Sequence, residues 1–266
     1  MSALTEDLFE TLKELNALKS LRDFALGGGT NLALAHGHRR SIDIDLFAGG
    51  NIGKKGFDLI EKEIRGFFRS KLLDLSYPCE ESEQYTFCRL LVLKKNETIK
   101  VDIMHNFKMM RPTELRDGIR TVSEFDVGIL KLLSLSDRAS QKDVYDLNLI
   151  TNFIPLPELF AGLKERGVKY SKPEDRNIFD LDRREDPIQD PLSLLKFDRH
   201  KDSAGQYGSP FHSNDRLDIL NGNISYVEAR IEWKLKIRGL FRQLGIQYPA
   251  LGQDYRNSHE NADESY

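Results

Sequence analysis

The sequence predicts an α+β fold in which a mixed sheet with flanking helices is followed by a mainly helical C-terminal part. Three patterns predict it. Residues 41–47 and 98–104 alternate apolar and polar side chains with the period of a β-strand. A glycine triplet at 27–29 separates an apolar run from a short helical segment, which is typical of a strand, a turn and a helix in succession. Beyond residue 151, prolines divide the chain into short helical pieces.

The composition is that of an ordinary soluble protein. A chain of 266 residues, 39% hydrophobic and 30% charged, can form one large domain or two smaller ones with proper cores. No uncharged apolar run reaches the roughly 18–20 residues that a membrane span needs. The acidic beginning of the sequence, MSALTEDLFETLKEL, lacks the basic region and apolar core of a signal peptide. We therefore expect a cytoplasmic protein without a membrane partner.

Cysteine content and charge exclude some classes of site. The two cysteines, Cys79 and Cys88, have no accompanying histidines, so a structural zinc site or a disulfide framework is not expected and both should be free thiols. The net charge of −3 argues against a protein that coats nucleic acid indiscriminately, although it leaves room for a local basic groove.

The N-terminal region should contain an amphipathic helix at residues 4–18 and a strand at 24–26. After the glycine triplet, Thr30 is expected to cap a short helix. Gly28 and Gly29 let the backbone approach a ligand closely, and the free N–H groups of the helix start, with the Thr30 hydroxyl, favour an anion such as a phosphate. Alone this pattern is weak, because many such turns carry glycines for steric reasons.

A pair of carboxylates follows on the first alternating run. Asp43 and Asp45 lie on the polar face of residues 41–47, roughly 6–7 Å apart along a strand. Two unpaired anions at this spacing repel each other, and the arrangement makes most sense if cations lie between them, as in two-metal sites. Hard oxygen ligands favour Mg²⁺ or Mn²⁺.

The second alternating run supplies a third carboxylate. Residues 85–93 and 98–104 should form a hairpin with its turn at 94–97, and Asp102 lies on the polar face of the second strand. If this strand pairs beside Asp43 and Asp45, three carboxylates converge in the layout of two-metal nucleotidyl transfer.

Between these runs, residues 48–56 contain four glycines and should form a loop, and residues 57–73 should form a second amphipathic helix.

These motifs resemble those of a known family. Gly-Gly-Thr at 28–30, His-Arg-Arg-Ser at 38–41 and Asp-Ile-Asp-Leu-Phe at 43–47 are similar to the signature of the AbiEii-type nucleotidyltransferase toxins, within the DNA polymerase β-like superfamily. The resemblance covers roughly residues 20–150. It continues in a helix with Lys131 and in the residues that follow, namely Arg138, Lys142, Asp143, Tyr145, Asp146 and Leu147.

The resemblance implies a polymerase β-like nucleotidyltransferase domain with a nucleoside triphosphate as substrate. It implies that Lys131 reaches the nucleotide phosphates, and it favours Asp143 over Asp146 as a site residue. It also implies an RNA acceptor, with a tRNA 3′ end as a candidate, and a separately encoded antitoxin protein that restrains the enzyme.

Several residues keep a second interpretation. Lys131 lies in an apolar helix and either extends to solvent or meets an anion. Asp143 and Asp146 share a helix face, where they either belong to the site or form surface ion pairs with neighbouring basic residues, Arg138 or Lys142. Arg39 could bind a phosphate or neutralise the acidic pair.

We expect a nucleotidyltransferase domain at 1–120, a helical domain at 121–252 that contributes Lys131 and Asp143 to the site, and a disordered tail at 253–266. The longest C-terminal helix should span residues 226–244. Its apolar residues are Val227, Ile231, Leu235, Leu240 and Leu244. Basic residues that form either a solvated face or an RNA contact recur every four positions at Arg230, Lys234, Arg238 and Arg242.

The sequence thus predicts a metal-dependent nucleotidyltransferase that acts as the toxin of a toxin–antitoxin or phage-defence system. The predicted cofactor is a pair of Mg²⁺ or Mn²⁺ ions bound by Asp43, Asp45 and Asp102. Predicted catalytic residues are Asp43, Asp45, Asp102, Lys131 and Asp143, and predicted nucleotide-binding residues are Gly28, Gly29, Thr30, Arg39 and Lys131. A transferase for small molecules such as aminoglycosides and a non-catalytic nucleotide-binding module are the alternatives.

Overall fold

The computed structural model describes residues 2–79, 81–181, 185–198 and 216–250. Its contacts divide the chain into two compact units. Unit 1 comprises Met1–Leu130, Ala161–Arg183 and Leu217–Asn223, and unit 2 comprises Lys131–Phe160, Arg184–Arg216 and Ile224–Tyr266. The predicted tail at 253–266 lies outside the described residues.

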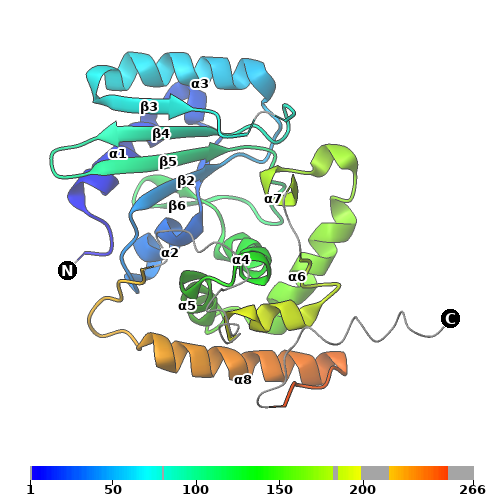
Figure 1. The fold of residues 1–266 in the computed structure, drawn as a ribbon. Coiled ribbons are helices and arrows are strands. Elements are labelled where there is room, and N and C mark those ends of the chain that lie inside the picture. Colours follow the sequence, from blue (N-terminus) through cyan, green and yellow to red (C-terminus); the bar gives the residue numbers. More distant parts are fainter. Residues whose placement is uncertain (1, 80, 182–184, 199–215, 251–266) are drawn as a thin grey trace, which may run out of the picture. The chain divides into compact units, whose positions relative to one another are not determined.

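Unit 1 is built on a seven-stranded mixed sheet in the order β3-β4-β5-β2-β1-β7-β6 (Figure 1). The pairs β2/β5 and β1/β7 are parallel, and the other neighbours are antiparallel. The strands are β1 (Ala25–Leu26), β2 (Asp43–Phe47), β3 (Leu72–Ser76), β4 (Cys88–Leu93), β5 (Thr98–Met104), β6 (Glu114–Arg116) and β7 (Ile119–Thr121). The predicted mixed sheet with flanking helices is confirmed.

Two expectations about the strands are confirmed, although β4 begins at Cys88 and not at the predicted residue 85. The hairpin of β4 and β5 closes at the predicted turn, where the Lys94 N–H donates a hydrogen bond to the Glu97 carbonyl at 2.9 Å. β5 also runs parallel beside β2, which is the pairing that brings the three carboxylates onto neighbouring strands. The strands β3, β6 and β7 were not predicted, because each is short and alternates too little to be distinguished from a loop.

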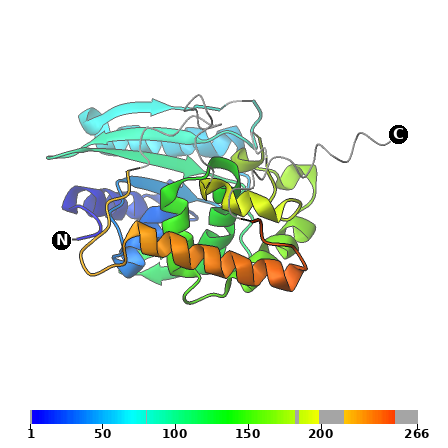
Figure 2. The ribbon, with the colours of Figure 1, turned by 60° about the horizontal axis from the view of Figure 1, so that its bottom comes forward.

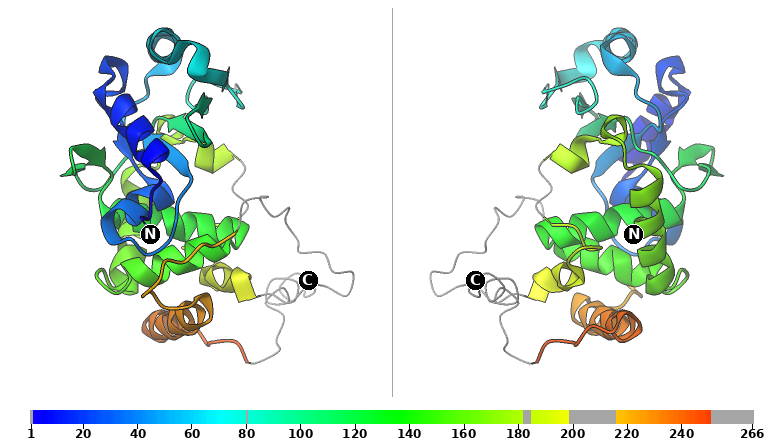
Figure 3. Two further views of the ribbon diagram at one scale, coloured as in Figure 1. Left: turned by 90° about the vertical axis from the view of Figure 1, so that its left-hand side faces the viewer. Right: turned by 90° about the vertical axis from the view of Figure 1, so that its right-hand side faces the viewer.

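Helices of unit 1 cover one face of this sheet. The helices α1 (Glu6–Ala17) and α3 (Gly53–Phe68) pack on the apolar face of β2, β4 and β5 (Figure 3). The shared core includes Ile44 of β2 and Ile103 of β5. Since side chains alternate along a strand, the polar residues of β2 and β5 lie on the opposite face of the sheet.

The predicted bounds of α3 were wrong at both ends. The helix begins inside the expected loop 48–56 at Gly53, whose φ of +58° suits glycine, and it ends at Phe68. After Phe68 the chain turns into the edge strand β3, which pairs with β4. Helical spacing alone does not show where an amphipathic helix gives way to a strand with similar apolar residues.

Later parts of the chain return to unit 1. Residues 38–40 pair with 218–220, through hydrogen bonds such as that from the Arg40 N–H to the Asp218 carbonyl at 2.8 Å. The Asn106 side chain donates to the carbonyl oxygens of Glu174 and Arg176. The two units are therefore not successive along the chain, and the division after residue 120 stays a prediction.

The remaining helices complete the two units. They are α2 (Gly28–His36), α4 (Glu124–Arg138), α5 (Gln141–Ile150), α6 (Leu156–Lys169), α7 (Ile178–Leu181), α8 (Tyr226–Leu244), and the 3₁₀ segments η1 (Lys19–Leu21), η2 (Arg69–Lys71), η3 (Pro173–Asp175) and η4 (Pro191–Asp198). None of the helices in the described part of the chain is both long enough and apolar enough to span a membrane.

In unit 2, α8 lies along α5 and has the predicted bounds (Figure 2). A capping box of Ser225 and Glu228 begins the helix, and Gly245 with φ of +71° ends it. Its buried side chains are Ala229, Trp233, Ile237, Leu240 and Phe241. Of the apolar residues named from the sequence, only Leu240 belongs to this face, whereas Val227, Ile231 and Leu235 are more than half exposed.

Both cysteines are free thiols, as predicted. Burial raises the pKa of the Cys88 thiol to about 12, so the thiol stays protonated at neutral pH and packs as part of the core.

Candidate active site

Five charged side chains gather on the polar face of three neighbouring strands of unit 1. In the parallel pair of β2 and β5, Asp43 lies opposite Lys100 and Asp45 lies opposite Asp102. On the other side of β5, Arg89 of β4 lies opposite Asp102. Paired residues of adjacent strands point to the same face. Three carboxylates and two cations are thereby brought together, with a formal charge of −3 + 2 = −1.

Asp102 is held by Arg89. The guanidinium donates two hydrogen bonds to the carboxylate, from Nε to Oδ1 at 2.7 Å and from Nη2 to Oδ2 at 2.9 Å. This hydrogen bonding raises the pKa of Arg89 against the effect of its burial, and the charges of Asp43 and Asp45 contribute further. A bidentate pair of this kind fixes both the position and the orientation of the Asp102 carboxylate.

Lys100 lies between two of the carboxylates. Its Nζ is 3.7 Å from Asp43 Oδ1 and 3.6 Å from Asp102 Oδ2. Neither Lys100 nor Arg89 was predicted as a site residue from the sequence. A signal was present for Lys100, which precedes Asp102 by two positions on the same alternating strand, but Arg89 depends on the register between β4 and β5.

The glycine turn lies directly against Asp45. Gly28 has a φ of +60°, and a Cβ atom at this position would be 2.4 Å from Asp45 Oδ2. The Gly27 N–H donates a hydrogen bond to the Asp45 carbonyl oxygen at 2.8 Å. Glycine is therefore required at position 28 both by its backbone conformation and by the carboxylate, which lies at the start of α2 where a helix favours an anion.

Thr30 does not cap this helix. α2 begins at Gly28 with Gly27 before it, so Thr30 is its third residue and is almost completely buried. The Thr30 hydroxyl donates a hydrogen bond to the Asp43 carbonyl oxygen and lies 2.7 Å from the Ser41 hydroxyl. It therefore joins α2 to the strand that carries Asp43, and the cap predicted from the sequence was wrong because a glycine turn can begin a helix without a side-chain cap.

Arg39 is buried beside the same turn. Its Nη2 is 1.9 Å from the place that a Cβ atom on Gly29 would occupy, and Nη1 donates a hydrogen bond to the Arg40 carbonyl oxygen at 3.0 Å. The guanidinium thus lies against the first turn of α2. At this place its positive charge can either bind a phosphate or neutralise the acidic pair, the two roles predicted for it.

The donor set suits a hard divalent cation only in part. Asp43 and Asp45 present carboxylate oxygens, the ligands that Mg²⁺ and Mn²⁺ prefer. In the described parts of the chain, however, no three side chains of the metal-binding types are grouped to hold a metal ion. The three aspartates share one face, as predicted, but Asp102 is bound by Arg89, and Lys100 lies between Asp102 and Asp43.

Lys131 and Asp143 belong to a charged network inside unit 2. The Lys131 Nζ is 2.7 Å from both Asp143 Oδ1 and Asp146 Oδ2, and Arg138 Nε donates to Asp143 Oδ2 at 2.7 Å. Both carboxylates are completely buried. The prediction of surface ion pairs was wrong, because the ion pairs of Asp143 and Asp146 are buried. It also lacked one partner, Lys131.

Burial alone would raise the pKa of Asp143. The charges of Arg138 and Lys131 and their hydrogen bonds outweigh this effect and lower the pKa to about 2. Asp143 is therefore ionised over the whole physiological pH range. The carboxylates that Lys131 contacts, Asp143 and Asp146, both belong to unit 2.

Comparison with known proteins identifies the family. Residues 11–232, most of the chain, match the family described as "Nucleotidyl transferase AbiEii toxin, Type IV TA system". The chain belongs to this family. AbiEii membership confirms the predicted family and its enzyme class, a nucleotidyltransferase, and it extends the likeness well beyond residues 20–150.

Two individual proteins are also similar to this AbiEii chain. An uncharacterized protein of Aquifex aeolicus (strain VF5) is 29% identical over 152 residues, which are 55% of this chain and 66% of the relative. The match thus spans slightly less than two thirds of the relative's length. The nucleotidyltransferase toxin MenT4 of Mycobacterium tuberculosis H37Rv is 15% identical, with a TM-score of 0.49, over 89% of this chain and 80% of MenT4.

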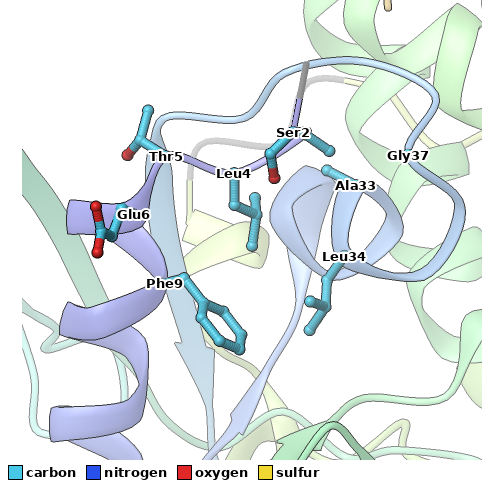
Figure 4. Close-up of a pocket in the computed structure, with 9 residues that line it drawn as sticks. Ser2, Leu4, Thr5, Glu6, Phe9, Ala33, Leu34 and Gly37 are labelled. Atoms are coloured by element: carbon cyan, nitrogen blue, oxygen red, sulfur yellow. The ribbon is translucent and has the colours of Figure 1, made fainter.

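A cavity in unit 1 is lined by other residues than the charged ones described above. It has a volume of about 480 Å³ and is located between the beginning of α1 and the later part of α2 (Figure 4). Leu4, Phe9 and Leu34 contribute apolar side chains, and none of the predicted site residues of this AbiEii protein lines the cavity. The chemistry of nucleotidyl transfer needs charged groups, so the cavity is not a candidate for the reaction centre.

Proposed function

We propose that the protein transfers a nucleotidyl group from a nucleoside triphosphate to an acceptor hydroxyl, with Asp43, Asp45 and Asp102 as the reaction centre. The parallel register of β2 and β5 carries this proposal, because it sets Asp45 level with Asp102 on the face that also bears Asp43. Membership of the AbiEii family supports the same chemistry.

The start of α2 would hold the triphosphate. The N–H groups of Gly28, Gly29 and Thr30 belong to the first turn, where an α-helix has no internal acceptors for them. Arg39 beside Gly29 would add a positive charge. The triphosphate and Asp45 are both anions at this helix start, so their approach needs further positive charge.

Asp43, Asp45 and Asp102 would hold Mg²⁺ or Mn²⁺, which when bound offsets the negative charge on the phosphates and on the leaving pyrophosphate. In the transfer, the acceptor oxygen forms a bond to the α-phosphorus, and the bond between the α- and β-phosphates breaks to release pyrophosphate. Asp102 would orient the acceptor hydroxyl and take its proton. Arg89, through two hydrogen bonds, would keep the Asp102 carboxylate in place.

The roles of Lys131 and Asp143 in the site stay predictions. Both residues have close partners inside unit 2, so a function in nucleotide binding would have to coexist with that network or replace part of it.

We further propose that the acceptor is RNA, with the tRNA 3′ end as the first candidate, and that a separately encoded antitoxin protein counteracts the enzyme. The antitoxin proposal is supported by the family description, which names a toxin of a type IV toxin–antitoxin system. The RNA acceptor is what the resemblance of the motifs to this family implies.

The test is transfer of label from each of the four α-labelled nucleoside triphosphates, with Mg²⁺, to total cellular RNA and to a panel of aminoglycosides. The variant is Asp45→Asn. Its matched control is Asp23→Asn, the same exchange at a side chain that is 82% exposed and pairs with the exposed Arg22.

Label on an RNA band that Asp45→Asn loses and Asp23→Asn retains would support the proposal and name the nucleotide. Label on an aminoglycoside would retain the transferase and replace the acceptor. Nucleotide binding without any transfer would contradict the proposal and favour a non-catalytic module.

A further inference from the structure

Lys100 occupies a special place among the charges of the candidate site. Its ammonium group is almost equally distant from Asp43 Oδ1 and Asp102 Oδ2, at 3.7 and 3.6 Å. These two carboxylates are among the three that the proposed function assigns to a divalent cation. The side chain of Lys100 is 34% exposed, so it retains contact with solvent while it neutralises both anions.

The two cations of the site are held differently. Arg89 makes two aligned hydrogen bonds to Asp102, at 2.7 and 2.9 Å, and is fixed by them. The contacts of Lys100 exceed hydrogen-bond length and are purely electrostatic. A lysine on a flexible four-carbon chain can leave such contacts at small cost, whereas a bidentate arginine cannot.

An ammonium group between two carboxylates competes with a divalent cation for the same anions. Both carry positive charge, and they repel each other at the short distance that joint occupation would require. A bound triphosphate changes this balance, because its phosphates offer Lys100 another anionic partner on the same open face.

We propose that Lys100 is a positioning residue that neutralises Asp43 and Asp102 in the nucleotide-free enzyme and moves to the triphosphate when nucleotide and divalent cation bind. This inference rests on the proposed function of the site. It makes the binding of the divalent cation and of the nucleotide mutually dependent, so that neither binds tightly alone.

Mn²⁺ binding measured by electron paramagnetic resonance tests this dependence without relying on activity. Binding is measured for the wild type and for Lys100→Met, with and without a triphosphate analogue that has a methylene group between the α- and β-phosphorus atoms. Lys95→Met is the matched control, since Lys95 is an exposed lysine in the turn of the same hairpin. Lys100→Gln serves as a second variant that keeps a polar side chain.

Without nucleotide, we expect both Lys100 variants to bind Mn²⁺ about tenfold more tightly than the wild type and Lys95→Met, a change of the size usual for coupling between sites. The analogue should strengthen Mn²⁺ binding about tenfold in the wild type, because it draws the ammonium group of Lys100 away from Asp43 and Asp102. The effect should be much smaller in the Lys100 variants, which lack this group.

Two outcomes would overturn the inference, namely equal Mn²⁺ affinity of wild type and Lys100 variants without nucleotide, or an unchanged effect of the analogue. Asp45→Asn separates this failure from failure of the proposed function. If the wild type binds Mn²⁺ and Asp45→Asn does not, the metal site stands while Lys100 loses its role. If Asp45→Asn binds Mn²⁺ as the wild type does, the site assignment itself fails and the inference with it.

Discussion

In two clusters within the described residues, a lysine and an arginine meet aspartates, and the clusters differ in burial and in the lengths of their contacts. In unit 2, Lys131 and Arg138 contact completely buried carboxylates at 2.7 Å. In the unit 1 cluster, the pair of Arg89 and Asp102 is equally short at 2.7 Å, but Lys100 stands 3.6 Å or more from its partners and the Asp43 side chain is 28% exposed.

This difference distinguishes charges that are costly to disturb from charges that a ligand can reach. A buried network with short contacts is costly to disturb, because the loss of one partner leaves an uncompensated charge out of reach of water. An open cluster with longer contacts can exchange its internal partners for the charges of a substrate. The contrast supports the proposed reaction centre in unit 1, and the following predictions test it.

The largest expected effect is on activity. Asp45→Asn should reduce nucleotidyl transfer by about 100- to 1,000-fold, the loss typical when one group that stabilises a transition-state charge is removed. Its free energy of unfolding should change by less than about 1 kcal/mol, because the variant relieves repulsion among three nearby carboxylates. Transfer of label and urea denaturation measure the two quantities. Full activity of Asp45→Asn would show that the centre lies elsewhere.

The same exchange in the buried cluster should act on stability instead. Asp143→Asn removes the anion that Lys131 and Arg138 share, while Lys131 keeps Asp146, and should lower the free energy of unfolding by about 3 kcal/mol. Asp23→Asn, in an exposed ion pair with Arg22, should leave stability nearly unchanged. Urea denaturation at pH 7 compares the three proteins. Equal stabilities of Asp143→Asn and Asp23→Asn would contradict the structural role of the network.

The buried cluster also predicts a dependence of stability on pH. The pKa of Asp143 is about 2 in the folded protein and near 3.8 when unfolded, so the unfolded chain takes up the proton first as the pH falls. The carboxylate therefore contributes up to about 2 kcal/mol above pH 4, and this contribution disappears as the pH falls through 2.

Asp143→Asn lacks this titration. The difference in unfolding free energy between wild type and variant should shrink by about 2 kcal/mol between pH 5 and pH 2. Urea denaturation in steps of one pH unit would show it. A constant difference over this range would mean that the network does not hold Asp143 in its ionised form.

The sequence was informative where the signal is local. The period of two in β2 and β5 placed Asp43, Asp45 and Asp102 on polar faces. The helix 226–244 was found with its bounds, but its buried face was not. The AbiEii motifs then identified the family.

The charge partners could not be found in this way. Arg89 joins the site only through the register of β4 on β5, and Lys131 of α4 meets Asp143 and Asp146 of α5 only through tertiary contacts. Contacts across strands and helices depend on tertiary packing, about which spacing along one element says nothing. The hydroxyl of Thr30 is a similar case, since its hydrogen bond to the backbone of β2 depends on how α2 lies on that strand.

The smallest expected effect concerns the glycine turn beside Asp45. Gly28→Ala combines a φ of +60° with a Cβ atom 2.4 Å from Asp45 Oδ2, so the variant should lose about 1–2 kcal/mol of stability and displace the carboxylate. Gly66→Ala in α3 is the matched control, because a Cβ atom there has nothing within 4 Å and alanine favours a helix. Urea denaturation and Mn²⁺ binding measure the two consequences. If Gly28→Ala were as stable as Gly66→Ala and bound Mn²⁺ normally, Asp45 would not depend on the glycine turn, and the link between the open cluster and the proposed phosphate site would be lost.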